Sequence, residues 1–181
     1  LDATHTHYVH AGLIRTASKR QTVTATVRQG IEQVEVEYTG EGKQSGLISK
    51  LFETDRAKSF GRFILPSTAE LEYCSSKGTV LTMTAYLTPR DAMNLQQSIH
   101  AVISLKTGYL PAKLKWWIIR PFFLKALRQD QHILKIQSAN LKDFNGASFR
   151  HTELDLIRPG IESILKGARF DKTEHTFTLQ L

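Results

Sequence analysis

The stretch QTVTATVR, residues 21–28, decides the fold class of this chain. Threonine side chains fall on one side of an extended backbone, and the valine and alanine side chains fall on the other. The stretch EQVEVE, residues 32–37, alternates glutamate with valine in a similar way. Alternation with a period of two is typical of a strand that buries one face and exposes the other. The two stretches therefore predict strands of a sheet with one apolar face.

Further strands and two helices follow. Strand-like sequence patterns recur in four more segments, which are separated by turns that contain glycine or proline. A long helix is predicted from about Ala112 to Leu141, with a kink or a restart at Pro121, and a shorter helix over Arg158–Leu165. Strands followed by a long helix indicate an α+β domain whose helix packs on one face of an antiparallel sheet. The four further predicted strands are Ala57–Leu65, Ala69–Cys74, Thr79–Leu87 and Gln97–Leu105.

The composition limits the class of protein. The 181 residues form one domain by length, carry a formal net charge of +7 and include a single cysteine, Cys74. A lone thiol excludes a disulfide framework and is typical of a reducing compartment. No signal peptide and no apolar run of about 18 residues is evident, so a cytoplasmic location is expected.

One cluster of cationic and aromatic side chains extends from Lys113 to Arg128. No nucleic-acid-binding motif accompanies it, and the other basic residues are spread along the chain, so nucleic acid is not an expected partner. The cluster has three interpretations: a helix that covers the sheet with its apolar side, a helix on a membrane surface, or a docking site for an acidic electron-transfer protein. Packing on the sheet is the favoured interpretation.

The first ten residues are dense in metal-binding groups. Asp2, His5, His7 and His10 supply one carboxylate and three imidazoles. Two histidines and one carboxylate on one face form the open-sided site of non-haem Fe(II) oxygenases, which leaves positions free for O2 and water. The stretch therefore predicts a metal site.

Spacing alone leaves two histidine pairs open. On an ideal helix His7 and His10 lie about 60° apart and share a face, whereas His5 and His10 lie about 140° apart. A straight helix therefore favours His7 with His10. The pair His5 and His10 requires a bulged or broken turn.

Two motifs resemble those of Rieske-type non-haem iron oxygenases. The first has the pattern Asp, two residues, His, four residues, His, which here is Asp2, His5 and His10. The second is a Gln-Asp step followed by an aliphatic pair and a glutamine, here within Gln129–Gln137. The resemblance implies that His5, His10 and Asp130 bind a mononuclear Fe(II). It also implies that Asp2 is not a ligand, but hydrogen-bonds a ligating histidine and bridges to a cluster histidine of a neighbouring subunit.

The resemblance also implies the fold and the domain organisation. The implied fold is a helix-grip domain of the START/Bet v 1 type, in which a curved antiparallel sheet wraps a long C-terminal helix. Residues 1–181 are then a single catalytic mononuclear-iron domain. A Rieske [2Fe–2S] cluster needs two cysteines and two histidines, so with Cys74 alone the cluster is expected in an upstream domain that is missing from an N-terminally truncated fragment.

The implied function is that of a mono- or dioxygenase that hydroxylates or demethylates an organic, ring-containing substrate. Implied partners are O2, a ferredoxin or flavin reductase that supplies electrons, and two further copies of the full-length protein in a homotrimer. Gln129 and His7 are expected near the ligands without binding the metal. Two alternatives stay open: a non-enzymatic helix-grip carrier of a lipid or small molecule, and a zinc hydrolase, which the lack of a His-Glu-x-x-His motif disfavours.

Overall fold

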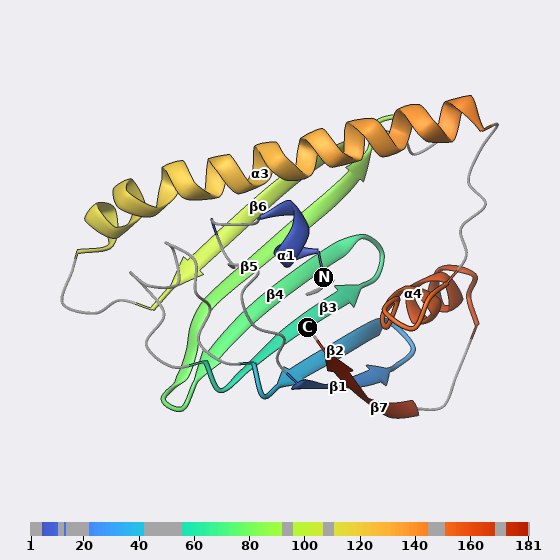
Figure 1. Ribbon diagram of the computed structural model, residues 1–181, viewed down its shortest axis with the longest axis horizontal. Helices are drawn as coiled ribbons and strands as arrows, with labels where there is room; N and C mark the ends of the chain where they lie inside the picture. The colour runs from blue at the N-terminus through green and yellow to red at the C-terminus, as the bar shows by residue number, and fades with distance from the viewer. Residues whose placement is uncertain are drawn as a thin grey trace.

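The computed structural model describes residues 5–10, 13, 22–41, 56–91, 96–106, 111–144, 151–168 and 173–180. Within these residues the chain forms a seven-stranded antiparallel sheet in the order β6-β5-β4-β3-β2-β1-β7 (Figure 1). The strands are β1 (Thr22–Gln29), β2 (Gln33–Thr39), β3 (Lys58–Ile64), β4 (Thr68–Ser75), β5 (Gly78–Pro89), β6 (Gln97–Leu105) and β7 (Thr173–Gln180).

Three helices accompany the sheet in the described part of the chain: α1 (Thr6–Val9), α3 (Ala112–Asp143) and α4 (Arg158–Leu165). Figure 1 shows α3 on the β5–β6 side of the sheet and α4 beside β1 and β2, with the single turn of α1 next to α3. The predicted α+β class is confirmed, and the long helix beside a curved antiparallel sheet is helix-grip-like.

The six predicted strands are all present, but the prediction misses β7. This strand pairs with β1 along its whole length, from Thr22 opposite Gln180 to Gln29 opposite Thr173. Its sequence does alternate threonine with apolar residues, which is a strand signal. The order of strands first and helices afterwards did not predict a strand that returns to the sheet after the last helix.

The apolar core lies between one face of β1 and β2 and the helix α4. Val23, Val34 and Val36 are at most 1% exposed, and they are the alternating valines from which the strands were predicted. Ile157 and Ile164, at the two ends of the α4 segment, pack against the same cluster. Alternation in the sequence therefore identified the buried face correctly.

Gly160 sets how closely α4 approaches β2. A Cβ atom at this position would lie 3.0 Å from both methyl carbons of Val34 and 3.1 Å from Oε1 of Gln29. Val34 is 0% exposed, so its side chain has no free space into which it can move. The packing of α4 on the sheet therefore requires glycine here.

We expect Gly160→Ala to lower the free energy of unfolding by about 1 kcal/mol, because overpacking outweighs the gain in helix propensity. Urea unfolding followed by circular dichroism measures the change. Leu165→Ala, at an exposed position of the same helix, is the matched control and should have a smaller effect. A stability gain in Gly160→Ala would contradict the tight approach.

The helix α3 continues through Pro121, so the predicted restart of the helix is wrong. Pro121 is exposed, and water can therefore satisfy the Trp117 carbonyl, which loses its helical donor. Among the described side chains of α3, Ile119 is the buried one, whereas Trp117 is 79% exposed. Most of the large apolar side chains in the Lys113–Arg128 cluster are exposed, so packing on the sheet accounts for only a small part of the cluster.

The opposite face of the sheet carries a network of paired charges. Arg62 donates from Nε to Glu35 at 2.6 Å, and from Nη1 to Glu70 at 2.7 Å and to Glu72 at 2.8 Å. Glu35 lies on β2, Glu70 and Glu72 lie on β4, and Arg62 itself lies on β3, so the guanidinium ties these three strands together. Arg28 forms similar hydrogen bonds with Glu35, Glu37 and Glu174.

This network lowers the pKa of two carboxyl groups, those of Glu72 and Glu37. Hydrogen bonds from the Thr79 hydroxyl and from Arg62 hold the pKa of Glu72 below its usual value of 4.5, although partial burial acts to raise it. Partial burial also acts to raise the pKa of Glu37, but hydrogen bonds from Arg28 and Lys58 outweigh it and the pKa is lowered. A carboxyl with a lowered folded-state pKa stabilises the fold above its unfolded pKa, and that contribution is lost as the pH falls through the folded value.

The free energy of unfolding should therefore decrease as the pH falls below 4.5, the usual value for these carboxyls. Glu72→Gln should be less stable than the unaltered chain at pH 7 and should lose less stability on acidification. Urea unfolding at several pH values measures both slopes. Glu153→Gln, at an exposed glutamate, is the control, and equal slopes in Glu72→Gln and the control would disprove the role of the network.

Candidate metal centre

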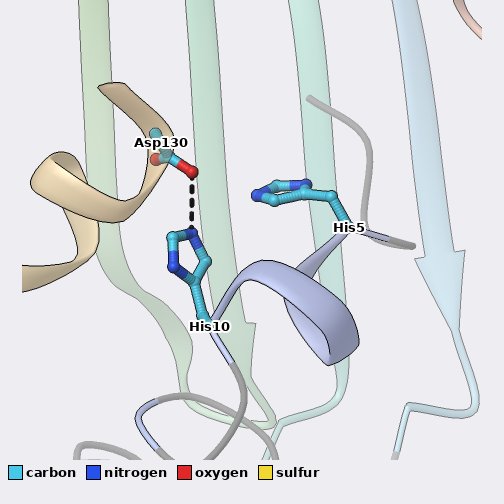
Figure 2. A group of neighbouring side chains, drawn as sticks. All are labelled: His5, His10 and Asp130. Atoms are coloured by element: carbon cyan, nitrogen blue, oxygen red, sulfur yellow. Dashed lines mark ion pairs between the residues drawn. The ribbon is translucent and has the colours of Figure 1, made fainter. Parts of the chain in front are cut away.

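Three side chains that are distant in the sequence meet between α1 and α3 (Figure 2). His5 and His10 flank α1, and Asp130 lies on α3. One potential ligand atom from each residue lies within 4.8 Å of the other two. In the part of the chain that the structure describes, no other three His, Cys, Asp or Glu residues come together in this way.

The shortness of α1 explains why His5 and His10 converge. The helix is a single turn, in which the His5 carbonyl accepts hydrogen bonds from the amides of Tyr8 and Val9 at 3.0 and 2.8 Å. His10 leaves the helical conformation, with φ −109° and ψ 29°. The ideal separation of about 140° applies only to a continuous helix. Because the turn ends at His10, the two imidazole rings lie edge to face with their centroids 5.2 Å apart.

Both ring nitrogens of His10 contact α3. Nε2 lies 3.1 Å from Oδ1 of Asp130, and Nδ1 lies 3.1 Å from Oε1 of Gln129. His10 is 3% exposed, whereas the side chain of Asp130 is 40% exposed. The imidazole is therefore held inside the protein, while the carboxylate is open to solvent on one side.

The donor set is suitable for a divalent transition metal. Imidazole nitrogen and carboxylate oxygen are common ligands of iron, zinc and related ions. Ligand atoms at about 2.0–2.2 Å from one ion lie about 3–4 Å from each other. The atoms of His5, His10 and Asp130 already lie within 4.8 Å, so small side-chain rotations would complete the site. Three protein ligands leave further coordination positions for small molecules.

The other predicted site residues are placed as follows. Gln129 lies against His10, on the side of the ring away from Asp130. His7 lies within α1, and its side chain falls outside the described part of the chain, as does the whole of Asp2. His132 is exposed on α3. The sequence suggested Gln129 only through the Gln-Asp motif, because no spacing rule links a residue to a partner 119 positions away.

The fold and the site define a class of protein: a helix-grip-like domain with a candidate centre of two histidines and one carboxylate between its N-terminal turn and its long helix. Residues 1–176 match the family described as the vanillate O-demethylase oxygenase C-terminal domain. The chain belongs to this family and is therefore the catalytic domain of a Rieske-type oxygenase, which confirms the resemblance found in its sequence. No curated protein and no solved structure gives a significant match.

None of the described helices combines the length and the apolar character that a membrane-spanning helix needs. The long helix α3 carries charged side chains along its whole length, from Lys113 to Lys142.

Proposed function

We propose that this domain holds one Fe(II) through His5, His10 and Asp130 and uses O2 to hydroxylate or O-demethylate an organic, ring-containing substrate. The convergence of the three ligand groups within 4.8 Å carries the proposal. Membership of the oxygenase family supports iron rather than another metal. When bound, Fe(II) supplies the redox chemistry that activates O2.

The residues of the chain have separate roles in this proposal. His10 is buried and held by two contacts from α3, so it offers the ion a ligand whose orientation is fixed. Asp130 supplies the negative charge, and its side chain is 40% exposed, so small molecules in the solvent can reach the carboxylate. His5 completes the set from the other end of α1. Two neutral imidazoles and one carboxylate leave the centre with a net charge of about +1, which favours anionic oxygen ligands.

The proposed reaction is a monooxygenation. A substrate C–H bond, O2, two electrons and two protons give C–OH and one water molecule. In O-demethylation the bond between the aryl oxygen and the hydroxylated methyl carbon then breaks, the carbon leaves as formaldehyde, and the aryl oxygen takes up the proton of the new hydroxyl group to give the phenol. The name of the family, vanillate O-demethylase, makes an aromatic methyl ether a suitable first substrate to test.

The electrons must come from outside residues 1–181. Cys74 is the only cysteine, and a Rieske cluster needs two. We propose a [2Fe–2S] cluster in a separate domain, reduced by a ferredoxin or flavin reductase, and a homotrimer in which the cluster of one subunit lies next to the iron of its neighbour. Asp2 is proposed to connect the cluster to a ligating histidine.

The first test is metal stoichiometry in the 1–181 chain, purified without a nickel column and reconstituted anaerobically. About one Fe(II) per chain is expected, and His5→Ala, His10→Ala and Asp130→Ala should each weaken binding by more than about 100-fold, because each removes a ligand. His132→Ala is the control, since this exposed histidine lies two positions from Asp130. Absence of metal would favour the carrier alternative, and selective binding of zinc would favour the hydrolase.

The second test concerns Asp2. In the complete oxygenase with its reductase, Asp2→Asn should keep iron bound but slow substrate turnover by about 10- to 100-fold, because the amide cannot replace a carboxylate that orients a ligand and links it to the cluster. Iron content and the rate of product formation measure the two effects. Unchanged turnover would exclude the bridging role, and loss of iron would make Asp2 part of the binding site.

A further inference from the structure

Two consecutive residues of α3 contact the two nitrogens of one imidazole. Oε1 of Gln129 lies 3.1 Å from Nδ1 of His10, and Oδ1 of Asp130 lies 3.1 Å from Nε2. Both partners come from one helix of 32 residues, so the distance between them is set by regular backbone geometry. The ring of His10 therefore has one orientation relative to α3.

We infer that Gln129 is a positioning residue that selects Nε2 as the metal-binding nitrogen of His10; this inference rests on the proposed function. A neutral imidazole has one N–H group and one lone pair. The amide oxygen of Gln129 can only accept, so a hydrogen bond to it keeps the proton on Nδ1. The lone pair is then on Nε2, the nitrogen that faces Asp130.

The local structure shows why His10 needs an external support. A single helical turn is not stable by itself, because nucleation of a helix is unfavourable. His10 also has a backbone conformation outside the helical range, so α1 does not fix its side chain. The contact with Gln129 joins this turn to α3 and orients the imidazole ring of His10 before a metal binds. Partners of this kind typically change metal affinity by about 10- to 100-fold.

The amide also differs from a carboxylate at the same place. A carboxylate that accepts from the distal N–H of a ligating histidine increases the basicity of the imidazole. A neutral amide orients the ring and fixes its tautomer with a smaller effect on basicity, because it carries no charge. Gln129→Glu therefore keeps the acceptor and adds a charge, whereas Gln129→Leu removes the acceptor and keeps most of the volume.

The experiment compares Co(II) and Zn(II) affinities of the 1–181 chain and three variants by competition with a chelator. Gln129→Leu should bind both ions about 10- to 100-fold more weakly. Gln129→Glu should retain the affinity of the unaltered chain or exceed it. Gln131→Leu, at an exposed glutamine of the same helix, should match the unaltered chain. Circular dichroism verifies that each variant folds.

Nitrogen-15 NMR of the Zn(II)-loaded protein gives an independent result. In the unaltered chain His10 should bind Zn(II) through Nε2 and keep its proton on Nδ1, and in Gln129→Leu this single state should be lost. Binding through Nδ1 in the unaltered chain, or equal affinities for Gln129→Leu and Gln131→Leu, would overturn the inference. If the unaltered chain binds no metal, the proposed function fails, and this assignment fails with it.

Discussion

The two contacts between His10 and α3 are the interactions on which the candidate site depends. They join the tenth residue of the chain to residues 129 and 130, and so bring a one-turn helix with no stability of its own against the longest element of the fold. Without them His5 and His10 would be two histidines on a short N-terminal turn. With them, the nitrogens of both residues and the carboxylate of Asp130 face one small volume.

The two faces of the sheet are stabilised in different ways. On one face the valines of β1 and β2 pack with α4, and Gly160 permits the close approach. On the other face Arg28 and Arg62 each bind three glutamates from neighbouring strands, so ion pairs hold the strands together there.

Much of the fold could be predicted because its signals are local. Alternating threonine and valine identified β1, and the valines proved to be the core. The prediction of the fold failed where the structure of a segment depends on its packing against residues distant in the sequence. The strand β7 has a regular alternation, but it pairs with β1, about 150 positions earlier. The aromatic residues of α3 indicated burial, yet Trp117 is 79% exposed, because the burial of a helix side chain depends on which distant elements pack against it. The helix also continues through Pro121, at an exposed position where water satisfies the freed carbonyl.

The sequence by itself determined the family and indicated the candidate ligands, because the spacing of Asp2, His5 and His10 and the Gln-Asp step are properties of the linear chain. Helical spacing could not choose between His5 and His7 as the partner of His10, since an ideal helix favours His7, whereas the resemblance of the motif implied His5. In the tertiary structure His5 lies next to His10 and Asp130, because α1 ends after one turn and does not continue as an ideal helix. The imidazole ring of His10 is held from α3 by Gln129 and Asp130. The contact between Gln129 and Nδ1 was likewise decided by tertiary structure alone, since it depends on how two helices far apart in the sequence pack.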